Sequence, residues 1–203
     1  MAHPVFAWAG LRPLQAQHTE AEHRALEKHG RGRRSVVELG VAEGASAVGV
    51  LEVMDPGGTL HLVDPYHLSR VPALNFMRRA AHRAVSANGG AKVVWLENFS
   101  YEVARDWSAP IDFLFIDGDH QEEAVERDWK QWSGFLEADG VAAFHDARVF
   151  PGGWTWPDYG PVRFVDRMFR KNSGSEWAIL EEVDSLVFVG QRKRPGREPH
   201  QEC

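Results

Sequence analysis

The feature that most constrains this chain is an alternation of short apolar runs with amphipathic segments between residues 35 and 146. Each apolar run ends at a glycine or a polar residue and is followed by a segment with helical spacing, which is typical of buried strands joined by helices. The predicted strands are Ser35–Leu39, Thr59–Val63, Lys92–Leu96, Ile111–Ile116 and Val141–Phe144. The predicted helices are Ala45–Met54, Pro72–Ala87, Ser100–Trp107 and Glu122–Glu137. Such an alternation predicts a parallel sheet with helices on both faces.

The alternation stops after Asp146. A loop rich in Gly, Pro and aromatic residues over 147–160 precedes a helix predicted at Pro161–Lys171, with Pro in its first turn. Two further strands are predicted at Trp177–Glu181 and Leu186–Gly190, joined by a tight turn. The predicted fold class is therefore α/β, a Rossmann-like, doubly wound and mostly parallel sheet that carries a C-terminal antiparallel strand pair.

The first 34 residues stand apart from this pattern. Residues 1–18 look irregular, and Thr19 with Glu22 forms a capping-box signature that predicts a helix over Glu20–Lys28. We expect 1–34 to be an N-terminal helical segment acting as a lid or an interface, 35–191 to be the main domain and 192–203 to be a flexible tail.

Composition excludes some classes of partner. The net charge of −6 gives no electrostatic reason to bind nucleic acid or an anionic membrane, and no apolar run is long enough to span a bilayer. A single cysteine, Cys203, cannot form an internal disulfide, so a cytoplasmic protein is the expectation.

Parallel sheets bind ligands at the carboxyl ends of their strands, so the residues there are the candidate site. The first strand runs into Glu38, Gly40, Gly44 and Ser46, where the glycines allow a tight turn and a close approach to a ligand. Dinucleotide-binding proteins usually show GxGxxG here, but this chain lacks the middle glycine. Asp64 ends the second strand, where its carboxylate is able to accept bonds from both hydroxyls of a ribose.

These residues resemble the first motif of class I methyltransferases, in which an acid and glycines end strand one and another acid ends strand two. The resemblance implies S-adenosylmethionine (SAM) as the cofactor. It places Gly40 and its neighbours at the methionine part, Asp64 at the ribose, and Asn98, Phe99 and Ser100 near the adenine. Phe99 is as readily explained by core packing.

A second group of polar residues lies at the fourth and fifth strands. Asp117 and Asp146 each follow a strand end, so both should lie at one sheet edge, where carboxylates suit a hard divalent cation. Such a cation would orient a substrate hydroxyl, and His120, three residues after Asp117, would take its proton as a general base.

The stretch from Asp117 to Asp146 resembles metal-dependent O-methyltransferases of small molecules, including sugar and macrolide-sugar enzymes of antibiotic pathways. The resemblance covers roughly residues 35–146 and implies natural product biosynthesis. It assigns Asp117 and Asp146 to the metal and His120, with Asp117, to catalysis. His145 is a further candidate metal ligand, and Asp117 is also a candidate for the cofactor site. Relatives often carry an acid where this chain has His145, and a nitrogen ligand shifts the preference from Mg²⁺ toward Mn²⁺.

Plainer roles remain open for the same residues. Asp117 with the following glycine is also a turn signal, Asp119 caps the next helix, and His145 fits a buried, hydrogen-bonded histidine. Asp128 and Asp166 are interpreted as solvated helix charges. The aromatic side chains of the 147–160 loop, Trp154, Trp156 and Tyr159, suit a sugar ring or a flat substrate, or else cover the sheet edge or a dimer contact.

The resulting hypothesis is an enzyme that moves a methyl group from SAM to a hydroxyl of a small molecule. The alternatives are an NAD-dependent oxidoreductase, an inactive binding protein on the same fold, and methylation of nitrogen or carbon. The sequence does not identify the acceptor, and it leaves open whether the chain forms a homodimer.

Overall fold

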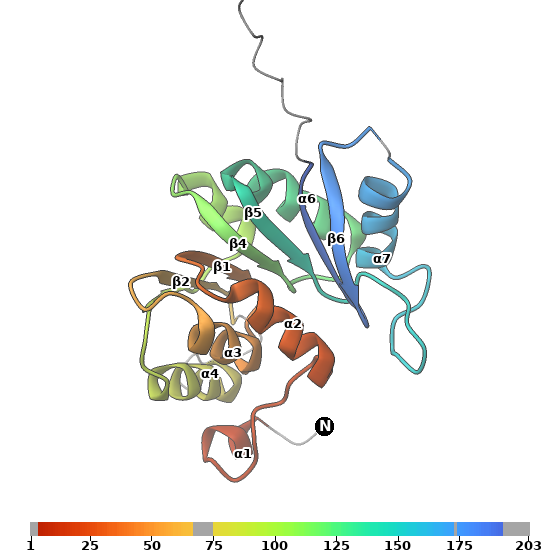
Figure 1. Cartoon of the computed structure of the whole chain (residues 1–203). Coiled ribbons are helices and arrows are strands. Elements are labelled where there is room, and N and C mark those ends of the chain that lie inside the picture. The colour runs from red at the N-terminus through yellow and green to blue at the C-terminus, as the bar shows by residue number, and fades with distance from the viewer. Residues whose placement is uncertain (1–3, 67–74, 173, 193–203) are drawn as a thin grey trace, which may run out of the picture.

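A seven-stranded sheet organises the computed structural model, which describes residues 4–66, 75–172 and 174–192 (Figure 1). The strands lie in the order β3-β2-β1-β4-β5-β7-β6, with β7 antiparallel to both of its neighbours and the other pairs parallel. Their bounds are β1 Ser35–Leu39, β2 Thr59–Val63, β3 Lys92–Leu96, β4 Ile111–Ile116, β5 Leu136–Phe144, β6 Trp177–Val183 and β7 Leu186–Gln191. The predicted fold class is confirmed, including the antiparallel pair at the end.

Helices cover both faces of the sheet (Figure 1). Their bounds are α1 Val5–Trp8, α2 Glu20–Gly30, α3 Ala45–Val53, α4 Phe76–Ala87, α5 Ser100–Val103, α6 Glu122–Trp132 and α7 Gly160–Val165. Strand residues alternate between the two cores: Phe113 and Phe115 of β4 face the side of α2, α3 and α4, whereas Leu114 faces the side of α6 and α7. The central strands β1, β2, β4 and β7 are mostly buried on both faces and mostly apolar, and this made them visible in the sequence.

The start of β5 was predicted wrongly. The helix expected to reach Glu137 ends at Trp132, and the expected turn at 138–140 lies within β5. The reason is strand pairing, because Leu136 already pairs with Ile111 and the register shifts before Phe113. A bulge therefore accommodates the polar residues that look like a turn in the sequence.

The N-terminal region also differs in part from the expectation. The capping box of α2 is present, since Thr19 and Glu22 bond reciprocally as predicted. Residues 5–8, expected to be irregular, form the short helix α1. The start of the helix predicted from Pro72 and the tail from 193 onward lie outside the described residues. Within the described parts, no helix is long and apolar enough to cross a bilayer.

Candidate active site

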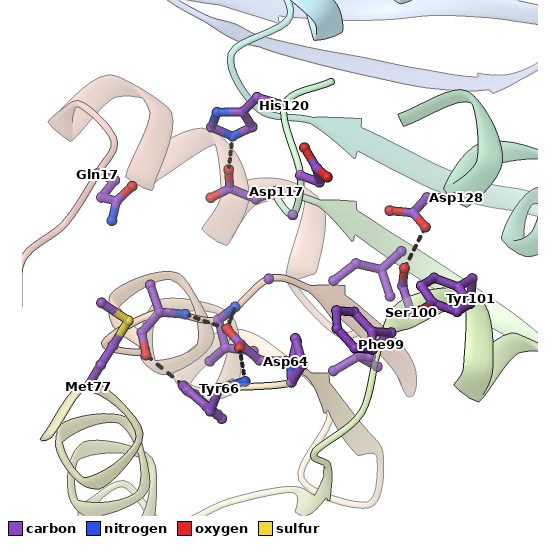
Figure 2. A pocket seen from close by; sticks show the side chains of 18 of the residues that line it. Gln17, Asp64, Tyr66, Met77, Phe99, Ser100, Tyr101, Asp117, His120 and Asp128 are labelled. Carbon is purple, nitrogen blue, oxygen red and sulfur yellow. Dashed lines mark hydrogen bonds and ion pairs between the residues drawn. The ribbon is translucent and has the colours of Figure 1, made fainter. Parts of the chain in front are cut away.

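A cavity of about 1020 Å³ opens at the carboxyl ends of β1, β2 and β4 (Figure 2). One part of its wall is the β1–α3 loop with Asp64 and the Phe99–Tyr101 segment, and another part is formed by residues 117–120. The cavity thus joins the two groups of polar residues that the sequence singled out.

Gly40 is required at the turn after β1. Its φ is +88°, and a Cβ there would lie 2.1 Å from the backbone oxygen of Asp117. Any side chain at position 40 would therefore clash with the end of β4. The glycine permits both the left-handed backbone and the close approach of two strand ends.

Asp64 clamps the same loop. One carboxylate oxygen accepts bonds from the backbone N–H groups of Val41 (2.9 Å) and Ala42 (3.1 Å), and the other accepts from Tyr66 N–H (2.8 Å). Ala42 has a φ of +49°, so the bonds hold a strained turn in place. Asp64 also lines the cavity. Its carboxylate therefore positions the loop, whether or not it also binds a ligand in the cavity.

Glu38 lies behind the loop. It is 1% exposed, accepts a 2.5 Å bond from Ser46 Oγ and has a second carboxylate oxygen without a hydrogen-bond partner among the described residues. Burial raises the pKa of Glu38 to about 8, against the opposing effect of Ser46. Glu38, Gly44, Ser46 and Asn98, all predicted to bind the cofactor, do not line the cavity.

Phe99 and Ser100 do line the cavity, together with residues that the sequence reasoning missed. Ser100 Oγ donates a 2.5 Å bond to Asp128, whose side chain was expected in solvent but is buried. Tyr101 stacks on Phe99, and the guanidinium of Arg127 lies over the Tyr101 ring. Asp128 follows Ala124 by four residues on α6, so it shares the helix's buried face, and that spacing was the available signal.

The opposite wall carries two of the predicted reaction residues, Asp117 and His120. The other predicted metal and substrate residues do not line the cavity, namely His145, Asp146, Trp154, Trp156 and Tyr159. His120 Nε2 lies 3.6 Å from Asp117 Oδ1, and His120 Nδ1 lies 3.7 Å from Asp146 Oδ2. Burial lowers the pKa of His120, but the two carboxylates outweigh it, so the pKa is raised. Tyr159 also reaches this group, because its hydroxyl forms a hydrogen bond with His120 Nδ1. Four side chains that were predicted from separate parts of the chain are therefore in contact, namely Asp117, His120, Asp146 and Tyr159.

His145 lies among the same carboxylates. Its Nδ1 is 3.1 Å from Asp117 Oδ1 and 3.4 Å from Asp146 Oδ1, and its side chain is 2% exposed. Burial lowers the pKa of His145, yet the neighbouring carboxylates raise it well above its ordinary value. Burial raises the pKa of Asp117, and the two histidines more than reverse this, lowering it to about 2.

Glu22 is a participant that the sequence reasoning took only for a helix cap. It is fully buried, accepts bonds from Ser185 N–H (2.7 Å) and Ser185 Oγ (2.6 Å), and lies 3.7 Å from His145 Nε2. Burial would raise the pKa of Glu22, but the nearby His145 ring and the bonds from Ser185 and Thr19 lower it to about 2. Helix α2 thereby supplies a charged group to the reaction wall.

A family model described as "Methyltransferase domain" matches residues 37–147 of the chain. That match covers more than half of the sequence and spans both walls of the cavity. The chain belongs to this methyltransferase family.

Solved structures agree in fold. An O-methyltransferase from Streptomyces achromogenes involved in tomaymycin synthesis, solved with SAM, has a TM-score of 0.67 at 16% identity, covering 94% of this chain and 88% of its own. An O-methyltransferase from Bacillus cereus, solved with S-adenosylhomocysteine (SAH), has a TM-score of 0.59 at 16% identity. The match covers 93% of this chain and 89% of the Bacillus chain. An rRNA methylase from Streptococcus thermophilus has a TM-score of 0.60 at 10% identity. The match covers 88% of this chain and 100% of the Streptococcus chain. Identities this low show the fold and leave the acceptor open.

The residues of this methyltransferase do not fit the expected divalent metal. Among the described residues, no group of three or more His, Cys, Asp or Glu side chains is arranged to hold a metal ion. His145 lies between Asp117 and Asp146, and Asp146 Oδ1 already accepts a 2.6 Å bond from the indole N–H of Trp154. Asp146 Oδ1 is thus already occupied by the indole N–H, and the His145 ring lies against both carboxylates.

The aromatic loop is anchored on the methyltransferase's reaction wall. Trp154 bonds to Asp146, Tyr159 bonds to His120, and Trp156 packs on Tyr159 with ring centroids 4.6 Å apart. Trp154 and Trp156 nonetheless remain 45% and 54% exposed, so the loop combines fixed polar contacts with exposed aromatic surface.

The N-terminal segment lies against the cofactor loop. Arg12 forms a two-pronged ion pair with Glu43 (2.8 and 2.6 Å), whose side chain is buried next to Gly44. Gln17 lines the cavity, which Figure 2 shows on the side opposite Phe99. Pro4 and Gln17 of this segment line the cavity, and the role of 1–34 as a lid or an interface stays a prediction.

Proposed function

We propose that this methyltransferase transfers the methyl group of SAM to a hydroxyl oxygen of a small molecule, with His120 as the general base. The observation that carries the proposal is the single cavity that joins the Asp64 loop and the Phe99–Ser100 segment to Asp117 and His120. The names of the solved relatives with SAM or SAH support the choice of cofactor.

The charge of the cavity supports SAM over NAD. Four aspartates line it, namely Asp64, Asp117, Asp119 and Asp128. A carboxylate-rich wall favours the positive sulfonium and amino groups of SAM, whereas it repels the two phosphates of NAD. The missing middle glycine of the dinucleotide motif points the same way.

In the proposed reaction, the hydroxyl oxygen attacks the methyl carbon in line with the bond to sulfur. The new C–O bond forms as the C–S bond breaks, the bonding pair returns to sulfur to give SAH, and the hydroxyl proton passes to His120. Asp117 and Asp146, each within 3.7 Å of that ring, stabilise the resulting imidazolium. The protein therefore contributes positioning and proton removal.

An oxygen acceptor fits a base better than a nitrogen acceptor does. An alcohol must lose its proton as it attacks, whereas a neutral amine attacks with its lone pair. The aromatic loop favours a sugar or another ring-containing acceptor, because exposed indole faces bind the apolar faces of rings. Metal assistance is left out of the proposal, since the residues do not fit a cation.

Calorimetry with SAH, and with NAD⁺ as the control ligand, tests the cofactor first. We expect SAH to bind with micromolar affinity and NAD⁺ not to bind. Binding of NAD⁺ alone would favour the oxidoreductase, and SAH binding without turnover on any hydroxylated acceptor would favour an inactive binding protein.

The base is tested with His120→Gln. We expect SAH formation to fall by about 10²- to 10⁴-fold, the usual contribution of a general base, with SAH affinity unchanged. His82→Gln is the matched control, because His82 lies on α4, pairs with Glu97 after β3, and does not line the cavity. Equal activity of the two variants would remove His120 from the mechanism.

A further inference from the structure

The side chain of Gln17 takes no part in the reaction described above. It lines the cavity from the N-terminal segment and has no hydrogen-bond partner among the residues that the structure describes. Figure 2 shows it on the side of Met77, opposite Phe99. An amide offers two N–H donors and a carbonyl acceptor, so an uncommitted amide in a cavity wall is available to a ligand.

The chain on either side of Gln17 is held in place. Gln15 N–H donates a 2.8 Å bond to Oε2 of Glu43, which is buried in the β1–α3 loop. Thr19 caps α2 and donates a 2.6 Å bond from Oγ1 to Asp184 Oδ2. Because the backbone is already fixed at both ends, a ligand contact at Gln17 costs little ordering of the segment.

The other side-chain N–H donors among the described residues of the cavity wall are engaged elsewhere. Asn75 Nδ2 donates a 2.8 Å bond to the backbone oxygen of Tyr66. His120 faces the two carboxylates of the reaction wall. The guanidinium of Arg127 lies 4.6 Å from the centre of the Tyr101 ring, at the far end of the cavity (Figure 2). The uncommitted amide therefore stands alone as a side-chain donor at its end of the described wall.

SAM carries one group that an acidic cavity does not suit. Its amino-acid part ends in a carboxylate, and the four aspartates of the wall repel an anion. With the adenine at Phe99 and the ribose at Asp64, the amino-acid part extends toward the end where Gln17 lies. A lysine or arginine there would pair with the aspartates, whereas a neutral amide stays available and still donates to a carboxylate.

We infer that the side-chain amide of Gln17 donates a hydrogen bond to the carboxylate of the amino-acid part of SAM. Gln17 is then a specificity-determining residue, which distinguishes the whole cofactor from nucleosides that lack this part. It lies outside residues 37–147, so the N-terminal segment supplies a contact that the matched methyltransferase domain does not contain. The inference rests on the proposed use of SAM.

Calorimetric titration with two ligands tests the inference. SAH carries the amino-acid part, whereas 5′-methylthioadenosine has the same nucleoside and sulfur without it. Gln17→Ala should weaken SAH binding by about tenfold, the effect of losing one hydrogen bond to a charged group, and leave the affinity for methylthioadenosine unchanged. Gln17→Glu should weaken SAH binding further, because two carboxylates then face each other.

Gln15→Ala is the matched control. Gln15 lies two residues away in the same segment, does not line the cavity, and holds Glu43 through a backbone N–H that the substitution keeps. This variant should keep both affinities. Gln17 is exposed, so its variants should melt near the unaltered protein, and a weaker SAH affinity then reports the lost contact.

The other outcomes contradict the inference. Unchanged SAH affinity in both Gln17 variants would overturn it, and so would an equal loss of affinity for SAH and methylthioadenosine. A changed KM for an acceptor at constant SAH affinity would assign Gln17 to the acceptor instead. Failure of the proposed function looks different, because the unaltered protein would then bind neither ligand, which refutes the choice of cofactor together with the role of Gln17.

Discussion

Asp64→Asn separates two roles of the second-strand acid. The sequence suggested that Asp64 binds a ribose, whereas the structure shows its carboxylate accepting three backbone N–H groups. An asparagine keeps the size of the side chain but offers a single carbonyl oxygen. That oxygen serves either Val41 and Ala42 or Tyr66, and the amide NH₂ then faces an N–H donor on the other side.

The cost follows from these three bonds. A hydrogen bond to a charged group contributes about 1.5–3 kcal/mol and a neutral one about 0.5–1.5 kcal/mol, so losing one bond and weakening two costs roughly 3.5–6 kcal/mol. Asp64 is only half-buried, and water replaces part of the lost bonding, so we expect about 2–4 kcal/mol of destabilisation. For a chain of this size, a loss near the middle of that range lowers the melting temperature by about 6–12 °C.

Thermal unfolding followed by circular dichroism measures this cost. Asp55→Asn is the matched control, because Asp55 makes one comparable bond, to Gly57 N–H (2.7 Å), in an exposed turn. We expect the control to melt near the unaltered protein and Asp64→Asn to melt well below it. Equal melting of the two variants would refute the clamp.

Titration with SAH then isolates the ribose. A destabilised Asp64→Asn that still binds SAH with full affinity would show that the carboxylate only holds the loop. A loss of affinity of about 10-fold or more, measured where the variant is fully folded, supports the second role and corresponds to at least about 1.4 kcal/mol of binding free energy.

Three other predictions follow from the same geometry. Burial raises the pKa of Glu38 to about 8 from its ordinary 4.5, so the native state retains a proton that the unfolded chain loses, and stability falls as pH rises across that window. Between about pH 5 and pH 8, the melting temperature of Glu38→Gln should therefore fall less than that of the unaltered protein. Parallel plots of melting temperature against pH for the two proteins would contradict the burial argument. Arg12→Ala leaves the Glu43 carboxylate buried without its ion pair, so SAH binding should weaken by about tenfold and limited proteolysis should cut the N-terminal segment sooner; unchanged affinity and cleavage would remove the lid role. Tyr159→Phe removes the hydroxyl on His120 Nδ1, so turnover should fall by about tenfold with a shifted pH profile and constant SAH affinity, whereas an unmoved profile would make Tyr159 a packing residue.

Local patterns predicted most of the sheet because its central parallel strands are mostly apolar. Ile111–Ile116 was found to the residue, since both of its faces are buried. The start of β5 was predicted wrongly because pairing with Ile111 outweighs the helical spacing before it. A turn-like string of Ala, Asp and Gly becomes part of a strand only when a partner strand is already in place.

The residues of the candidate site were likewise predictable only where their role follows from the local sequence. Asp117, His120 and Asp146 were visible because they sit directly after strands, where the fold brings residues together. The capping role of Glu22 was predicted correctly, but its bond to Ser185 was missed because Ser185 is distant in the sequence. Asp128 was misread for the same reason, since Ser100 reaches it from a separate helix. Charge on a helix looks solvated in a sequence until the element that covers it is known.

Gly40 links the two walls more tightly than either motif suggested. A Cβ there would lie 2.1 Å from the backbone oxygen of Asp117, so the cofactor loop and the reaction wall are in direct backbone contact. Methyl transfer needs the acceptor atom, the methyl carbon and sulfur in line, and a misplacement of about 1 Å costs on the order of 100-fold in rate. A side chain at position 40 would push the two walls apart by more than that. The glycine therefore serves alignment as well as the turn, which is why the first motif and the Asp117 motif have to be read as one site.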